Sequence, residues 1–152
     1  MANVDNECKN LEVRNLKSED FDFIFLLQKK AQEQNYGFDF DKMSLKKIAD
    51  FWFANKHALD DELSEMFDAL GGINDGIGNA AWKYWKRDHE RADKMTIQDL
   101  SENDLKELKF EIVDAFHFLI NFAVSINMTG SEMYDMYISK NRENIRRQND
   151  NY

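Results

Sequence analysis

The sequence contains no proline, although a chain of this length holds about seven or eight at average usage. Because proline costs roughly 3 kcal/mol in a helix interior, its absence favours helices. It also disfavours a proline-turned β-sandwich and excludes collagen and proline-rich linkers. The 152 residues and the hydrophobic share of 43% argue against intrinsic disorder. They fit one domain with a buried core.

Cysteine and long apolar runs are also scarce. The single cysteine, Cys8, excludes an intramolecular disulfide and favours a reducing setting. The longest dense apolar stretch, residues 116–126, is interrupted by Asn121 and is too short to span a bilayer. The first ten residues lack the apolar core of a signal peptide. We therefore predict a cytoplasmic protein that has no membrane partner.

Basic residues are fewer than acidic ones, 20 against 29, and the net charge is −9. This balance disfavours direct binding to nucleic acid, which relies on cationic contacts with phosphates. The basic residues are not evenly spread, because several of them gather near the C-terminus. A small polyanion therefore stays compatible with the sequence.

Apolar residues recur at helical spacing along most of the chain. Glycines of the 71–79 loop, Ser101 and the Thr129-x-x-Glu132 capping box mark helix ends. No segment alternates with period two, so we predict an all-α fold, a helical bundle of four to five main helices. We expect a flexible N-terminal arm over 1–17 and a single domain over 18–152. The predicted helices span 20–34, 44–70, 80–91, 101–127 and 129–148.

Two pairs of carboxylates share a helix face with the apolar positions. They are Glu62-x-x-Glu65 and Glu111-x-x-Asp114, and residues three apart lie on one face of a helix. If the two helices pack antiparallel, four carboxylates converge, and a divalent cation then offsets their repulsion. We predict Mg²⁺ there, with Mn²⁺ as the substitute ion. The alternative is a pair of solvated acidic faces, since a chain with many acidic residues shows this spacing by chance.

Histidine placement argues against a ferritin-like di-iron site. Such a site expects two Glu-x-x-His motifs, and here only Asp114-x-x-His117 approaches that pattern. We predict His117, which has apolar neighbours, to be a hydrogen-bonded core histidine.

Two groups of cationic and amide residues could bind phosphate. Lysine offers a point charge and arginine a planar fork of donors. For the group on the last helix, the alternative is a basic last turn that complements the helix dipole. For the group after the glycine loop, the alternative is that its aromatic residues belong to the core. Together with the carboxylates, these groups suggest metal-assisted hydrolysis of a nucleotide anhydride. The two groups are Lys140, Asn141, Asn144, Arg147 and Gln148 on the last helix, and Trp82, Lys83, Trp85 and Lys86 after the glycine loop.

The ordered set of motifs resembles the all-α NTP pyrophosphatases, in particular the dimeric dUTPases. The stretch from residue 70 onwards is more similar still to the dCTPase–dUTPases of T-even-like phages. The resemblance covers roughly residues 20–152. Its motifs are Glu62-Leu-Ser-Glu65, Trp82-Lys-Tyr-Trp-Lys86, Glu111-Ile-Val-Asp114, Lys140-Asn-x-x-Asn144-x-x-Arg147-Gln148 and the terminal Tyr152.

The resemblance implies a Mg²⁺-dependent hydrolase that cleaves dCTP and dUTP to the monophosphates and pyrophosphate. It implies that the four carboxylates bind metal and that Glu65 also orients or deprotonates the attacking water. Lys140, Asn144 and Arg147 match residues that grip the phosphates. The family further implies a homodimer and, in the phage setting, a place in nucleotide synthesis within the host cytoplasm. Near the nucleoside, the matching residues are Gln28, Gln32, Trp82 and Trp85.

Two other functions compete with this interpretation. One is a broader-specificity, MazG-like house-cleaning NTP pyrophosphatase with the same fold. The other, from a different class, is a noncatalytic acidic helical protein that binds a partner.

Overall fold

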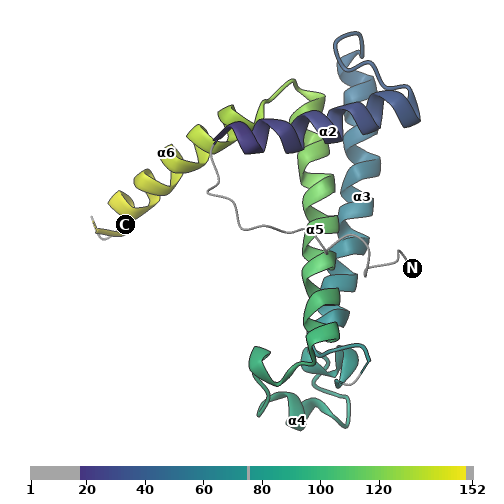
Figure 1. Ribbon diagram of the computed structural model, residues 1–152, viewed down its shortest axis with the longest axis vertical. Coiled ribbons are helices and arrows are strands. Elements are labelled where there is room, and N and C mark those ends of the chain that lie inside the picture. Colours follow the sequence, from purple (N-terminus) through teal and green to yellow (C-terminus); the bar gives the residue numbers. More distant parts are fainter. Residues whose placement is uncertain (1–17, 75, 150–152) are drawn as a thin grey trace. The chain divides into compact units, whose positions relative to one another are not determined.

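The computed structural model describes residues 18–74 and 76–149 as a succession of helices (Figure 1). No strand occurs within these ranges, which confirms the predicted all-α fold. The proposed arm over 1–17 and Tyr152 lie outside the described residues. The elements are α2 (Ser18–Tyr36), α3 (Leu45–Ala69), the 3-10 helix η1 (Gly78–Ala81), α4 (His89–Ala92), the 3-10 helix η2 (Ile97–Asp99), α5 (Glu102–Ser125) and α6 (Gly130–Asn149).

Helix boundaries follow the capping residues of the sequence. The side-chain oxygens of Ser44 and Ser101 accept hydrogen bonds from backbone N–H groups in the first turns of α3 and α5. At the start of α6, the Thr129 N–H donates to Glu132 Oε2 at 2.8 Å, and the Glu132 N–H donates to Thr129 Oγ1 at 3.1 Å. The predicted capping box is therefore confirmed.

The predicted helix over 80–91 is wrong. The segment instead forms η1, a series of turns and the single turn α4. Short isolated helices gain little from propensity alone, and here a tertiary contact folds the chain back on itself. His89 Nδ1 lies 2.9 Å from the Ala80 carbonyl oxygen, a contact that a continuous helix over these residues would not allow.

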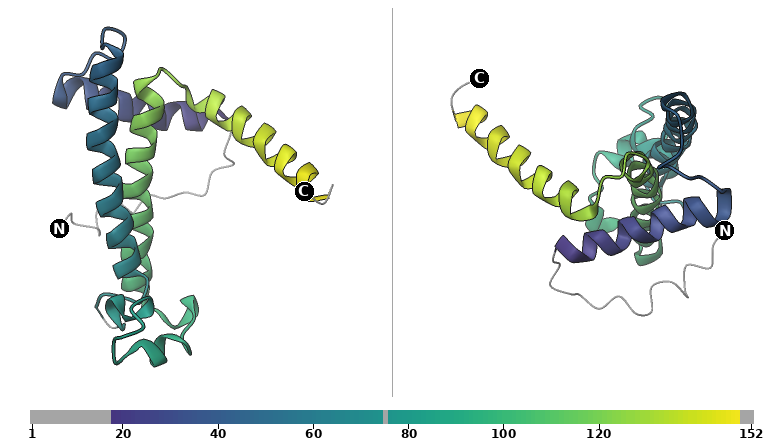
Figure 2. Two further views of the ribbon diagram at one scale, coloured as in Figure 1. Left: turned by 180° about the vertical axis from the view of Figure 1, so that it is seen from behind. Right: turned by 90° about the horizontal axis from the view of Figure 1, so that it is seen from above.

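The chain divides into two compact units, residues 1–24 with 129–152 and residues 25–128. In the larger unit, α3 and α5 run antiparallel side by side, and the second half of α2 crosses the end where α3 begins and α5 ends (Figures 1 and 2). Buried apolar side chains fill the space between these helices. They include Phe25, Ile48, Phe51, Leu108, Ala115, Ile120, Ala123 and Val124.

Within the smaller unit, the start of α6 packs against the first turns of α2. Asp22 Oδ1 accepts a hydrogen bond from the Ser131 N–H at 2.7 Å, and its other oxygen accepts from the Ser131 hydroxyl. Gly130 allows this close approach, because a Cβ there would lie 2.2 Å from the carbonyl carbon of Phe21. A carboxylate thus caps the N-terminal end of α6.

At the other end of the α3–α5 hairpin, residues 71–74 and 76–100 form a lobe. Its first turn is anchored by Asp104, which is 1% exposed. One Asp104 oxygen accepts hydrogen bonds from the N–H groups of Ile73 at 2.8 Å and Asn74 at 2.7 Å, and the other accepts from Ser101 Oγ at 2.8 Å. The buried carboxylate therefore joins the lobe to the start of α5.

Among the described residues, no single helix is long and apolar enough to cross a membrane. Only α5 and α6 taken together meet the requirements of length and composition.

Replacing Asp104 tests this anchor. Asp104→Ala leaves two backbone N–H groups without their acceptor, so we expect the free energy of unfolding to fall by about 3 kcal/mol. Ser101→Ala removes a helix cap and one donor to the carboxylate but keeps both backbone hydrogen bonds of Asp104, so it should cost less, about 1–2 kcal/mol. Urea unfolding followed by circular dichroism measures both values. Equal midpoints for the two variants would contradict the assigned role of Asp104.

Candidate functional site

Three carboxylates from α3 and α5 meet halfway along the hairpin. One oxygen from each of Glu62, Glu111 and Asp114 lies within 4.8 Å of the others. All three side chains are half-buried, and the antiparallel packing brings the turn that holds Glu62 opposite the turn that holds the other two. An all-oxygen, anionic donor set of this kind fits a divalent metal ion.

Glu65 lies beside this triad and stays exposed. The negative charge of Glu65 raises the pKa of both Glu62 and Glu111, so Glu65 lies near the cluster. Of the four predicted metal ligands, the structure thus brings three within reach of one ion and puts the fourth at the edge. An exposed carboxylate at that edge can contact water directly.

The electrostatics of the cluster are those of crowded anions. Burial raises the pKa of Glu62, and the charges of Asp114 and Glu65 raise it further. Burial likewise raises the pKa of Glu111, with Glu65, Asp114 and Glu62 as the main like-charged neighbours. Ionising these groups together therefore destabilises the metal-free protein, and a bound cation reverses that effect.

The prediction that His117 is a core residue is wrong. Its side chain is 50% exposed, and its Nδ1 lies 3.5 Å from Asp114 Oδ1. The periodic apolar stripe of α5 suggested burial, but only part of that stripe is covered. When protonated, His117 lowers the pKa of Glu62, whereas the neighbouring carboxylates raise it.

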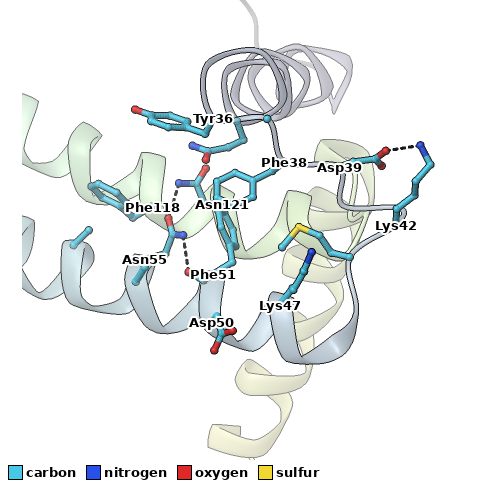
Figure 3. Close-up of a pocket in the computed structure, with 15 residues that line it drawn as sticks. Tyr36, Phe38, Asp39, Lys42, Lys47, Asp50, Phe51, Asn55, Phe118 and Asn121 are labelled. Atoms are coloured by element: carbon cyan, nitrogen blue, oxygen red, sulfur yellow. Dashed lines mark hydrogen bonds and ion pairs between the residues drawn. The ribbon is translucent and has the colours of Figure 1, made fainter.

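A pocket of about 740 Å³ opens next to the triad, in the same unit (Figure 3). Ala58 precedes Glu62 by four residues and Phe118 follows Asp114 by four, so the pocket begins one helical turn from the triad. Small-molecule sites commonly combine apolar surface with a few polar groups, and this wall combines apolar side chains with three amides and the charged Asp39, Lys42, Lys47 and Asp50. The lining residues include Gln32, Tyr36, Phe38, Phe51, Ala54, Asn55, Ala58, Phe118 and Asn121.

The pocket contains amide residues that the sequence analysis did not select. Asn121 is 2% exposed and Asn55 is 7% exposed. Gln28, one of the predicted nucleoside residues, donates from Nε2 to Asn121 Oδ1 at 2.8 Å, while Gln32 lines the pocket. The interruption of the apolar run 116–126 by Asn121 was the signal that could have identified this group.

The tryptophans lie elsewhere on the same hairpin. Trp82 packs against Phe67 of α3 and against Trp85, with ring centroids 6.3 Å apart in both pairs. Lys83 Nζ lies over the Trp82 ring at 4.6 Å and 3.8 Å from Asp68, and Lys86 is exposed. These residues belong to the lobe and do not line the pocket, so the triad lies between them and the amides along α3.

The predicted phosphate-binding residues share the exposed surface of α6, in the smaller unit. Arg147 Nε donates to Glu143 Oε1 at 3.0 Å, so one acid of the same helix partly offsets this charge. The carboxylates and the pocket belong to the larger unit, and a joint role with α6 stays a prediction. The residues concerned are Lys140, Asn141, Asn144, Arg147 and Gln148, all of them exposed.

Comparison with known proteins finds similar phage sequences. Over 131 residues the chain is 34% identical to a protein of Enterobacteria phage T4 named dCTP pyrophosphatase, covering 84% of this chain and 77% of that protein. It is 38% identical over 104 residues to a dCTP pyrophosphatase of Enterobacteria phage LZ5, covering 66% of this chain and 60% of the other. A T4 protein named DNA replication protein is 33% identical over 121 residues, covering 78% of this chain but 31% of that protein.

No family model matches the chain, and no solved structure matches it.

Neutralising one member of the triad tests the electrostatic description. We expect Glu62→Gln to raise the thermal midpoint of the metal-free protein by about 2 °C, because it relieves repulsion in the cluster. The same change should weaken the stabilisation that added Mg²⁺ or Mn²⁺ gives the wild type. Thermal unfolding with and without the ions measures both effects. Glu90→Gln, which changes an exposed acid of α4, should alter neither, and identical behaviour of the two variants would argue against a metal site at Glu62.

Proposed function

The chain belongs to the family of phage dCTP pyrophosphatases, and we propose that it hydrolyses dCTP and dUTP to dCMP, dUMP and pyrophosphate in a Mg²⁺-dependent reaction. The family membership agrees with the resemblance predicted from the motifs. The observation that carries the proposal is the triad of Glu62, Glu111 and Asp114 within 4.8 Å, one helical turn from a pocket of about 740 Å³. A dNTP needs such a pair of sites, one for its phosphates and one for its base.

Each part of the substrate has a group of residues that suits it. The three carboxylates would hold the metal ion, whose charge offsets that of the triphosphate. Glu65, exposed at the edge of the triad, would accept a proton from the attacking water as general base. The water oxygen then bonds to phosphorus as the anhydride P–O bond breaks, and the released pyrophosphate carries away the negative charge. Lys140, Asn144 and Arg147 would bind the phosphates by charge-assisted hydrogen bonds.

The pocket beside the triad suits the nucleoside. Phe51 and Phe118 offer apolar surface, and Gln32 with the two buried asparagines offers hydrogen bonds. Trp82 and Trp85, which the resemblance places near the base, lie in the lobe on the other side of the triad along α3. If they contact the same nucleotide, they do so from that side.

We further propose that the protein is a homodimer. Part of the predicted apolar stripe of α5 is not covered by residues 18–74 and 76–149: Ile112, Phe116 and Leu119 are 51%, 38% and 50% exposed. Phe53 of α3 is 67% exposed. Apolar surface of this kind along two neighbouring helices suits packing against a second copy of the hairpin.

We expect the enzyme to act in the host cytoplasm, without direct contact with nucleic acid or membrane. A role within a phage nucleotide-synthesis complex is part of the same proposal. Removing dCTP and dUTP would keep these nucleotides out of phage DNA and supply dCMP and dUMP for further synthesis.

The activity is tested by measuring pyrophosphate release from dCTP, dUTP, dTTP and dATP with and without Mg²⁺. We expect rapid release from dCTP and dUTP only, and only with the ion. Comparable rates on the purine nucleotide would favour the broader-specificity NTP pyrophosphatase. Release from none of them would favour the noncatalytic interaction protein.

The assigned base is tested by Glu65→Gln, which keeps the shape of the side chain and removes its basicity. We expect kcat to fall at least about 100-fold, the usual contribution of a general base, with an unchanged circular dichroism spectrum. Asp61→Asn removes the same charge from the same turn of α3 and should lower kcat far less. Loss of activity in both variants alike would point to general electrostatics instead of proton transfer.

The dimer is tested by Leu119→Glu, which puts a charge in the uncovered apolar stripe. Light scattering should give the wild type a mass of twice the 18.0 kDa chain and the variant the mass of one chain. Leu45→Glu, at an exposed leucine near the start of α3, should leave the dimer intact. A monomeric wild type at micromolar concentration would overturn the proposal.

A further inference from the structure

A chain of three amides crosses the wall of the pocket and joins α2, α5 and α3. Gln28 Nε2 donates to Asn121 Oδ1 at 2.8 Å, and Asn121 Nδ2 donates to Asn55 Oδ1 at 2.7 Å. Asn55 Nδ2 in turn donates to the carbonyl oxygen of Phe51 at 2.8 Å. Figure 3 shows the last two of these bonds beside the pocket. We call these three side chains the amide relay.

The backbone carbonyl at its end sets the direction of the relay. A carbonyl oxygen only accepts, so Asn55 must turn its NH₂ group towards Phe51 and its oxygen towards Asn121. Asn121 must then present its NH₂ group to that oxygen and its own oxygen to Gln28. Flipping either asparagine would bring oxygen against oxygen at a buried position, where an unsatisfied or repulsive contact is costly.

This fixed direction matters because both asparagines line the pocket. Each amide retains one N–H group and one oxygen lone pair beyond those used in the relay. The relay, and not the ligand, fixes the positions of this remaining N–H group and lone pair on each asparagine. A free amide could rotate to match whichever ligand arrived, whereas these amides present one pattern of donors and acceptors.

Cytosine and uracil are almost the same size but differ in their pattern of hydrogen-bond donors and acceptors. Cytosine has an acceptor at ring position 3 and an amino donor at position 4, whereas uracil has a donor at position 3 and an acceptor at position 4. Shape and apolar contact therefore distinguish them poorly. A hydrogen-bonding group of fixed direction distinguishes them well, because the wrong base leaves buried polar atoms unpaired.

We propose that the amide relay makes this pocket prefer cytosine to uracil, with Asn121 facing the base and Asn55 acting as a positioning residue. The inference rests on the proposed function, since it takes the pocket as the nucleoside site. It adds to that function a preference between its two substrates and the residues that set it.

The decisive variants act on the direction of the relay. Asn55→Leu removes the partner that holds the Asn121 NH₂ group, so Asn121 and Gln28 can turn together and accept either base. Asn55→Asp keeps an oxygen that accepts from Asn121. Its second oxygen faces the Phe51 carbonyl oxygen, so burial holds the group as the neutral acid, whose O–H donates to that carbonyl and preserves the direction. In Asn121→Asp, the oxygen that meets Asn55 Oδ1 must carry a proton and donate to it. Only acceptor lone pairs are then left for the base, and these match the N–H of uracil. Asn103→Leu, at an exposed asparagine of α5, is the matched control.

The measured quantity is the ratio of kcat/KM for dCTP to that for dUTP. We expect a ratio of at least about tenfold in the wild type and in Asn103→Leu, the factor that one hydrogen-bonding difference of 1.4 kcal/mol gives. Asn55→Leu should lower it to below about threefold, Asn55→Asp should retain most of it, and Asn121→Asp should invert it. A merely structural role would lower both kcat/KM values equally and leave the ratio unchanged. If Asn55→Leu fails to fold, the contrast between Asn55→Asp and Asn121→Asp decides.

Binding of dCMP and dUMP, measured by calorimetry on the same proteins, separates this inference from the proposed function. A wild type that hydrolyses no dNTP but binds dCMP better than dUMP, with the preference lost in Asn55→Leu, supports the relay and overturns the activity. A wild type that hydrolyses dCTP with the same ratio as Asn55→Leu overturns the relay and leaves the activity standing. Neither hydrolysis nor a preference for dCMP would overturn both.

Discussion

The antiparallel pairing of α3 and α5 is the constraint on which the candidate site depends. It brings Glu62 opposite Glu111 and Asp114, and two turns away it brings Asn55 opposite Asn121. The carboxylate triad and the amide pair are thus two consequences of one register between the same helices. A shift of one turn would separate the carboxylates and break the amide contact together, because neighbours on facing helices are set by the i, i+3 and i, i+4 spacing.

This pairing also explains how an acidic protein can suit an anionic substrate. The net charge of −9 would repel a triphosphate if it were spread evenly. Instead, part of it is concentrated in the triad and Glu65, where burial first, and then the neighbouring carboxylates, raise the pKa of Glu62 and of Glu111. In the proposed function, a divalent cation would relieve that repulsion and present positive charge to the phosphates. Charge that is unfavourable without metal would then contribute to substrate binding.

Much of this arrangement could be predicted from the sequence, because it depends on local spacing. The carboxylate pairs, the capping residues Ser44 and Ser101 and the absence of strands all follow from patterns within a few residues. The amide pair could not be found in this way, since Asn55 and Asn121 meet only through packing. The exposure of His117 and the irregular course of 80–91 were missed for the same reason. Both depend on tertiary packing: it leaves His117 uncovered, and it folds 80–91 back through the contact between His89 and Ala80.

The anchoring of the lobe by Asp104 has a consequence for how the site assembles during folding. The two halves of the site are 66 residues apart at the Asn121–Asn55 contact, so α3 and α5 must come together across a long loop, at an entropic cost. The Asp104 hydrogen bonds to Ile73 and Asn74 span only about half that separation and shorten the remaining loop. We therefore expect the lobe contacts to form before the carboxylates meet, because they close the shorter loop. A metal ion that binds only the completed triad should then slow unfolding and leave the folding rate largely unchanged.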